Sequence, residues 1–202
     1  AWTAYQNGDR NFCGNELPDG MRKNEAFPEP IITPSTKAAQ GEHDESVAPS
    51  ELYKRGAVDP GLYKELARIS MRLYERGVSR AAEHGMIFVD TKYEFGISNG
   101  KIMLMDEVNT PDSSRYWMKD DYEDRFEKGE EPRKLDKEYV RTWLSEQGFT
   151  GDGKPPKLTD EIRVEASARY MEVVEKFTGE PMQLDVGPVD KSIYSILNPF
   201  AY

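Results

Sequence analysis

The feature that most constrains this chain is the stretch from 88 to 117, where charged side chains fall on predicted strands. Five of them lie in what otherwise has the pattern of a buried β-hairpin: Asp90, Lys92, Glu94, Asp106 and Glu107. Burying an ionised group costs several kcal/mol unless the group is paired or binds a metal. We therefore interpret this stretch as part of a site rather than of a core.

The overall composition excludes several classes of function. A formal net charge of −10 over 202 residues argues against a nucleic-acid-binding surface, although local cations can still bind small anions. No apolar run approaches the roughly 20 residues that span a bilayer, and no signal peptide is visible. Cys13 is the only cysteine, so no intrachain disulfide can form. We expect a cytoplasmic protein that binds neither nucleic acid nor membrane.

The chain divides into two parts by composition. Residues 1–57 are punctuated by glycine and proline and predict a loop-rich segment of a substrate site. Residues 58–202 predict an α/β body that contains a metal-binding hairpin over 87–108. The predicted fold class is therefore mixed, with long helices beside a central sheet.

Two long helices have clear start and stop signals. Asp59 and Pro60 begin the first, which stops near Gly85, and the second runs over 160–178 with Gly179 as its C-cap. Their expected buried faces are Leu62, Leu66, Ile69 and Leu73 in the first helix and Ile162, Ala166, Tyr170, Val173 and Phe177 in the second.

A charged stretch over 118–133 lies between these helices. We interpret 110–117 as a loop and 118–133 as a surface helix or loop. Asp136 is expected to cap a short helix that ends near Gly148. The buried face of that helix is predicted to be Val140, Trp143 and Leu144.

The turn at Asn99-Gly100 allows two registers for the hairpin. A two-residue type I′ turn pairs Ser98 with Lys101 and places Asp106 away from Glu94. A three-residue loop with a G1 bulge at Gly100 instead pairs Ile97 with Lys101 and places Asp106 beside Lys92 and Glu94. We predict the bulged register, because only that register gathers the three charged groups on one face.

Two carboxylates beside a lysine suit magnesium and a polyphosphate, since Mg²⁺ prefers hard oxygen ligands and lysine neutralises phosphate. A salt-bridge ladder on the surface explains the same spacing equally well. Asp112, Ser113, Ser114 and Arg115 suit a phosphate or carboxylate ligand, but a helix cap beside a solvated arginine explains them too. Spacing alone leaves these alternatives open.

Four blocks of the sequence resemble one family, the phosphoribosylaminoimidazole-succinocarboxamide synthases (SAICAR synthetases). They are VDTKYEFG at 89–96, DEVNTPDSSRYW at 106–117, PIITPSTK with GEHDE at 30–45, and LDKEYVRTWL at 135–144. The blocks occur in the family's order and span most of the chain, so a chance match is excluded.

The resemblance implies a function and a fold. Members of this family use ATP and Mg²⁺ to join L-aspartate to carboxyaminoimidazole ribonucleotide in purine biosynthesis, through an acyl phosphate. Their fold is α/β and related to ATP-grasp and kinase-like two-lobed sites. A homodimer is possible.

The resemblance also implies roles for individual residues, with Lys92 and Asp106 as the catalytic pair. Glu94 and Asp106 would hold magnesium, and Lys37 and Lys92 would contact the nucleotide or substrate. The ribonucleotide pocket would be lined by Asp90, Asp112, Ser114 and Arg115, with Arg115 on the 5′-phosphate. The segment at His43-Asp44 would belong to the site without an assigned role.

Family members are longer at the N-terminus, where they carry a glycine-rich lobe that covers ATP. They also carry there an arginine and a Gly-Ser that help to hold the ribonucleotide phosphate. This sequence starts at Ala1-Trp2, which resembles the residues just after that Gly-Ser. The expectation is that the 202 residues alone are inactive. Two alternatives are a non-catalytic fragment or split subunit that needs a partner with the ATP lobe, and a kinase-like phosphotransferase, which leaves the blocks at 33–37 and 111–115 unexplained.

Overall fold

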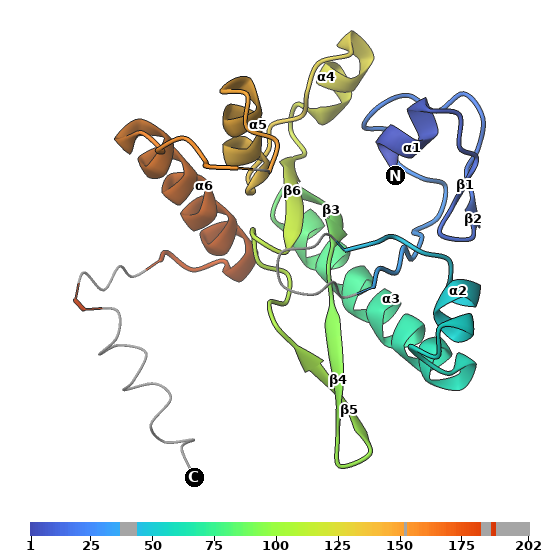
Figure 1. The fold of residues 1–202 in the computed structure, drawn as a ribbon. Coiled ribbons are helices and arrows are strands. Elements are labelled where there is room, and N and C mark those ends of the chain that lie inside the picture. The colour runs from blue at the N-terminus through green and yellow to red at the C-terminus, as the bar shows by residue number, and fades with distance from the viewer. Residues whose placement is uncertain (37–43, 152, 183–186, 189–202) are drawn as a thin grey trace.

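The computed structural model describes residues 1–36, 44–151, 153–182 and 187–188 and has mixed helix and sheet, as predicted (Figure 1). Short elements occupy the N-terminal part: α1 (Trp2–Gln6), β1 (Asn11–Phe12), β2 (Asn15–Glu16) and α2 (Pro49–Lys54). The body contains α3 (Pro60–Glu83), β3 (Met86–Thr91), β4 (Glu94–Ser98), β5 (Lys101–Met105), β6 (Ser114–Met118), α4 (Tyr122–Lys128), α5 (Glu138–Glu146) and α6 (Asp160–Thr178).

Both long helices start and stop where the sequence predicts. The Asp59 side chain accepts hydrogen bonds from the backbone N–H groups of Gly61 and Leu62, at 2.9 and 3.0 Å. Helix α6 ends at Gly179, whose φ of 79° is left-handed and so favours glycine. No helix in the described ranges is long and apolar enough to cross a membrane.

The central sheet is formed by strands that lie far apart in the sequence. Strand β3 pairs antiparallel with β6, and Trp117 of β6 forms a bridge with Lys134 on its other side. The predicted loop over 110–117 is therefore wrong in its second half, because 114–117 belong to β6. Tyr116 and Met118 of this strand are buried beside Met86 and Phe88, and that burial favours a strand over a loop.

The core lies between this sheet, α3 and α6. Its buried members are Ala81, Met86, Phe88, Tyr116, Met118, Leu135 and Val173. A row of neighbouring aromatic rings runs through it: Tyr74 is stacked on Phe88 (5.4 Å between centroids), Phe88 is tilted against Tyr116 (5.0 Å), and Tyr116 meets Phe177 edge-to-face (6.0 Å). The predicted face of α6 is confirmed as buried or half-buried, whereas the predicted residues of α3 are only half-buried and its fully buried positions are Gly77 and Ala81.

The hairpin β4–β5 contradicts the predicted register. Ser98 pairs with Lys101 and Ile97 with Ile102, so the loop has two residues and no bulge. Asn99 and Gly100 have φ values of 51° and 72°, which are those of a type I′ turn. Asparagine and glycine both tolerate these angles, and this turn matches the natural twist of the strands, so the sequence satisfies the shorter loop without strain.

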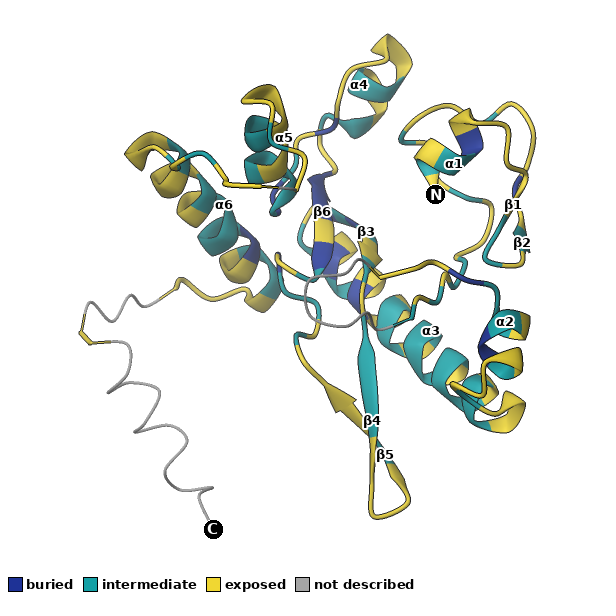
Figure 2. Cartoon of the chain, viewed as in Figure 1, coloured by how far each residue is buried: buried dark blue, intermediate teal, exposed yellow. Residues whose placement is uncertain are grey.

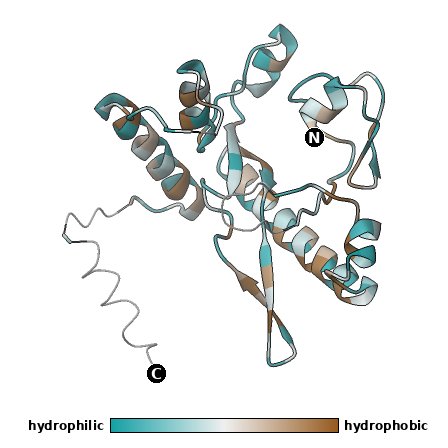
Figure 3. Cartoon of the chain, in the orientation of Figure 1, coloured by the Kyte–Doolittle hydropathy of each residue, from teal (hydrophilic) through white to brown (hydrophobic). Residues whose placement is uncertain are grey.

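The prediction of one continuous hairpin over 87–108 is also wrong. Strand β3 contains a bulge between Phe88 and Asp90 and ends at Thr91, so Asp90, Lys92 and Glu94 do not alternate along a single strand. Only β4 and β5 form the hairpin. It extends away from the body, and its exposed apolar residues include Ile97, Met103, Leu104 and Met105 (Figures 2 and 3).

The short helix α5 follows a segment that runs beside β6. Met118 N–H donates to Arg133 O and Leu135 N–H to Tyr116 O, at 3.0 and 2.9 Å. The predicted face of α5 (Val140, Trp143 and Leu144) is half-buried, and the helix ends at Glu146, close to the predicted stop. These contacts place the first turn of α5 beside the loop that leads into β6.

Candidate functional site

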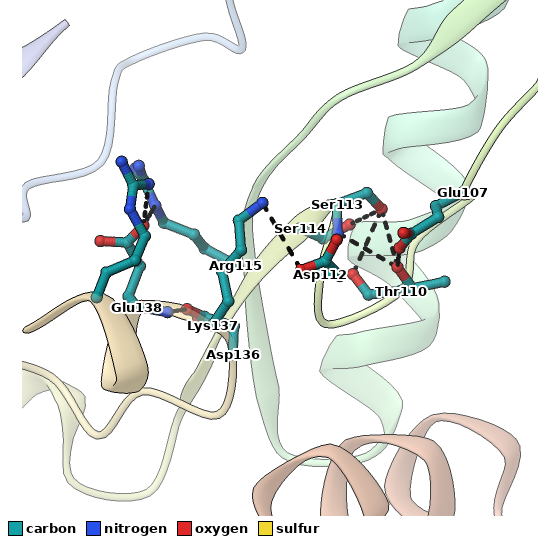
Figure 4. Close-up of polar contacts among 10 residues, drawn as sticks. Glu107, Thr110, Asp112, Ser113, Ser114, Arg115, Asp136, Lys137 and Glu138 are labelled. Atoms are coloured by element: carbon teal, nitrogen blue, oxygen red, sulfur yellow. Dashed lines mark hydrogen bonds and ion pairs between the residues drawn. The ribbon is translucent and has the colours of Figure 1, made fainter. Parts of the chain in front are cut away.

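The loop between β5 and β6 is held together by side-chain hydrogen bonds around Thr110 (Figure 4). The Thr110 hydroxyl donates to a carboxylate oxygen of Glu107 and accepts the backbone N–H of Ser113 at 3.2 Å. Asp106 and Asn109 have φ values of 62° and 57°, and both residue types tolerate this left-handed backbone. The sequence therefore forms a tight loop with polar side chains at the end of the sheet.

Ser114 is the buried first residue of β6, whereas the sequence predicted that it lies on a loop. It is 3% exposed, and its hydroxyl lies 2.8 Å from that of Thr91, its partner on β3. The Ser113 hydroxyl lies 3.3 Å away on the other side. Ser114 thus has hydrogen-bond partners within the protein, and its predicted role in a ribonucleotide pocket stays a prediction.

Arg115 and Asp90 are brought together by the pairing of β3 with β6. They lie opposite each other in the register, and Arg115 Nη1 is 3.0 Å from Asp90 Oδ2. A second carboxylate, Glu138 of α5, lies 3.8 Å from Arg115 Nε. Arg115 is therefore flanked by two acidic side chains and remains exposed, as a group that binds an anionic ligand must be.

Lys92 and Glu94 form the second charged group. Lys92 Nζ lies 2.7 Å from Glu94 Oε1 and 3.7 Å from Asp44 Oδ2. The hydrogen bond to Glu94 raises the pKa of Lys92, and the charges of Asp44 and Asp106 raise it further. Asp106 is thus within electrostatic range of Lys92 even though the register that was predicted to bring them together is wrong.

The backbone conformation of Asp106 explains how its side chain can act on Lys92 in this register. Strand β5 ends at Met105, and the left-handed conformation of Asp106 takes it out of the alternation of the strand. The face on which its side chain lies is consequently not set by the pairing of β4 with β5.

The described residues contain no group of three or more His, Cys, Asp or Glu side chains that could hold a metal ion. Glu94 and Asp106 are suitable ligands for a Mg²⁺ ion that a polyphosphate brings with it. Mg²⁺ that is carried by a polyphosphate takes only one or two protein carboxylates and completes its shell with phosphate oxygens and water. The donor set present is compatible with that arrangement.

Of the remaining predicted residues, the structure describes Asp112 but not Lys37 or His43. Asp112 is exposed, and its Oδ1 lies 3.9 Å from Lys137 Nζ. Lys37 and His43 lie outside the described residues.

Sequence reasoning missed Lys137 and Glu138, which approach Asp112 and Arg115 from α5 (Figure 4). Both fall inside the block at 135–144 that carries the family resemblance. The family resemblance of this block was the sequence signal for these two residues, whereas the local pattern predicts only a capped helix.

An α/β fold with carboxylates, a lysine and an arginine around one end of its sheet is typical of proteins that handle phosphorylated small molecules. The family model of SAICAR synthetase matches residues 4–178, and the chain belongs to this family. The predicted resemblance is confirmed.

Two kinds of relatives support this assignment. A phosphoribosylaminoimidazole-succinocarboxamide synthase of Bacteroides thetaiotaomicron is 54% identical over 182 residues, which are 89% of this chain and 58% of that protein. A SAICAR synthase structure from Saccharomyces cerevisiae, complexed with SAICAR, has a TM-score of 0.74 and 34% identity over 91% of this chain and 57% of that one. A SAICAR synthetase in complex with ADP has a TM-score of 0.57 and 27% identity, covering 83% of this chain and 57% of that one. This chain thus spans less than two thirds of the length of these relatives.

Proposed function

We propose that this chain forms part of an ATP-dependent ligase that joins L-aspartate to carboxyaminoimidazole ribonucleotide and yields SAICAR, ADP and phosphate. The observation that carries the proposal is that two charged groups are built on neighbouring residues, at the end of β3 and directly after it. Lys92 with Glu94 and Asp106 forms one, and Arg115 with Asp90 forms the other. The family and the ligands named for its solved structures support the same function.

The group around Lys92 suits the nucleotide. Glu94 and Asp106 would hold the Mg²⁺ that accompanies ATP and neutralises charge on its phosphates. A lysine is charged at neutral pH, and the hydrogen bond to Glu94 raises the pKa of Lys92 further, so its ammonium can face a phosphate. We assign Lys92 and Asp106 as catalytic residues on this basis, with Lys37 as a further nucleotide contact.

The group around Arg115 suits the ribonucleotide. The guanidinium can bind a phosphate through two parallel hydrogen bonds, while a carboxylate such as Asp90 or Asp112 can accept hydrogen bonds from ribose hydroxyls. Asp90 and Glu138 orient the arginine without burying it. We therefore propose Asp90, Asp112, Ser114 and Arg115 as the substrate-binding set.

The chemistry needs charge neutralisation rather than an enzyme nucleophile. The carboxylate of the ribonucleotide attacks the γ-phosphorus of ATP, the bond to ADP breaks, and an acyl phosphate forms. The amine of aspartate then attacks the acyl carbon, loses a proton and displaces phosphate. Fixed positive charge beside the developing negative charge lowers both barriers.

Binding of the product is the direct test with this chain. Calorimetric titration with SAICAR should show binding to the wild-type chain, and Arg115→Ala should weaken it by roughly ten- to a hundredfold, because hydrogen bonds between charged groups are lost. Arg68→Ala removes an exposed arginine of α3 and serves as the control. Equal affinity for SAICAR in Arg115→Ala and wild type would remove Arg115 from the site.

Turnover is tested in a protein of the relatives' full length that contains this chain. Asp106→Asn should abolish Mg²⁺-dependent formation of SAICAR from ATP, aspartate and carboxyaminoimidazole ribonucleotide. Asp120→Asn, at an exposed carboxylate that pairs with Arg133, should leave turnover unchanged. Full activity of the Asp106→Asn protein contradicts the proposed metal site.

The alternative of a non-catalytic fragment or split subunit is not favoured, since the relatives named above are synthases. A cytoplasmic location and a homodimer stay predictions.

A further inference from the structure

Asp136 is the most deeply buried charged side chain in the described part of the chain, at 1% exposure. A carboxylate in such a place costs free energy, and burial raises its pKa, although two backbone hydrogen bonds oppose this rise. Neither the core nor the proposed chemistry requires a carboxylate at this position. The contacts that this buried carboxylate makes therefore indicate its role.

Both carboxylate oxygens of Asp136 accept a backbone hydrogen bond, and the two donors lie on different elements. Oδ2 accepts from Tyr116 N–H of β6 and Oδ1 from Glu138 N–H at the start of α5, each at 2.9 Å. The cap of α3 is different, because Asp59 is exposed and its recorded bonds go only to its own helix. Asp136 thus fastens the first turn of α5 to β6.

The two attachment points adjoin the proposed substrate residues (Figure 4). Tyr116 follows Arg115 directly, and Glu138 Oε1 lies 3.8 Å from Arg115 Nε. Lys137, which lies between Asp136 and Glu138 in the sequence, has its Nζ 3.9 Å from Asp112 Oδ1. Ion pairs as long and exposed as these contribute little to stability, so they form only where α5 is already held in place. Two backbone hydrogen bonds, from Leu135 N–H to Tyr116 O and from Lys137 N–H to Pro111 O, hold the segment before the helix. The buried bonds of Asp136 add the link between β6 and the first residue of α5.

We propose that Asp136 is a positioning residue, which holds Glu138 and Lys137 against Arg115 and Asp112 and so fixes the direction in which Arg115 presents its guanidinium to a substrate anion. The inference rests on the proposed function only in assigning Arg115 to the ribonucleotide phosphate. The placement of Arg115 by Asp136 can be tested without any ligand.

The ligand-free test compares the Asp136→Asn variant with the wild-type chain by NMR. The measured signal is that of the Arg115 side-chain Nε–H, which is identified by its loss in the Arg115→Ala variant. Asparagine has nearly the same shape but can accept only one of the two hydrogen bonds, and its NH₂ group faces the other donor. We expect the Arg115 signal to shift. The matched control is Asp59→Asn, which makes the same substitution at an exposed carboxylate that accepts backbone N–H groups at the start of α3, and it should leave the signal unchanged. An unchanged Arg115 signal in Asp136→Asn overturns the proposal.

If Asp136→Asn does not fold, Glu138→Gln tests whether Glu138 positions Arg115, which the proposal requires. This variant retains the N–H that Asp136 accepts and removes only the charge beside Arg115. It should also shift the Arg115 signal, and no shift means that Glu138 does not position the arginine.

The second test measures SAICAR affinity by calorimetry. Asp136→Asn should weaken binding by about tenfold in the wild-type background and should add no loss in the Arg115→Ala background, because both changes act through the same group. An equal loss in both backgrounds means that Asp136 merely supports the fold and overturns the proposal. If neither the wild-type chain nor the protein of the relatives' full length that contains it binds SAICAR, the proposed function fails while the NMR result still decides the role of Asp136.

Discussion

Gly77 lies where α3 makes its closest contact with β3 and the site loop. A Cβ atom at this position would lie 2.7 Å from Phe88 Cε1 and 3.2 Å from Asn109 Nδ2. Asn109 in turn accepts hydrogen bonds from Tyr93 through its side chain and from Tyr116 through its backbone, at 2.7 and 2.6 Å. The absence of a side chain at one helical residue therefore allows the helix to contact the loop that carries the site.

We expect Gly77→Ala to destabilise the protein by about 1 kcal/mol. Overpacking costs roughly 1–3 kcal/mol, and the better helix propensity of alanine returns up to about 1 kcal/mol. The free energy of unfolding in urea measures the net effect. Ser79→Ala, at an exposed position of the same helix, should change this free energy by less than about 0.5 kcal/mol. A Gly77→Ala protein as stable as wild type would show that Phe88 can move aside freely.

At the level of elements, Arg80 of α3 is bonded to the end of α6. Arg80 Nε and Nη2 donate to the backbone oxygens of Phe177 and Thr178, each at 2.8 Å. These carbonyls belong to the last turn of α6, which has no partners for them within the helix. The positive charge also favours this end of the helix dipole. Arg80 thus caps α6 from the neighbouring helix.

Arg80→Ala should lower the free energy of unfolding by about 1–2 kcal/mol and accelerate amide hydrogen exchange in the last turn of α6. Arg80→Lys should recover only part of the loss, because one ammonium cannot reproduce the two-pronged contact. Arg76→Ala, at an exposed arginine of the same helix, is the control and should leave exchange in α6 unchanged. Unchanged exchange in Arg80→Ala contradicts the cap.

The elements also show where prediction from the sequence succeeded. The caps at Asp59 and Gly179 were predicted correctly because each depends on a few adjacent residues. The hairpin register was wrong because it was chosen to gather charges, although the Asn99-Gly100 turn chemistry pointed to the shorter loop. Strand β6 was missed because its first residues, Ser114 and Arg115, resemble a loop when taken alone.

At the scale of the whole molecule, the aromatic core links stability to pH. Burial raises the pKa of Tyr93 to about 12 and that of Tyr170 to about 12, and it raises the pKa of Tyr116 as well. An unfolded tyrosine ionises at about 10. Between these values the folded state retains protons that the unfolded state has lost, so stability falls as the pH rises.

The free energy of unfolding, measured in urea, should therefore decrease as the pH rises above about 10. Tyr93→Phe should be less stable than wild type at pH near 7, because the hydrogen bond to Asn109 is lost. The difference between the two proteins should shrink above pH ~10, since phenylalanine does not ionise. A difference that stays constant up to pH ~11 means that Tyr93 is not protected from ionisation.

The family, the long helices with their caps, and the charged residues can be recognised without a structure, because each depends on neighbouring residues or on short blocks. Which of these residues lie together follows from the fold alone. The pairing of β3 with β6 joins segments more than twenty residues apart, and it depends on burying Phe88 and Tyr116 between α3 and α6. That pairing places Arg115 opposite Asp90 and Tyr116 within reach of Asp136. No local sequence pattern predicts the pairing of β3 with β6, because the burial of distant apolar surfaces selects one strand pairing among many.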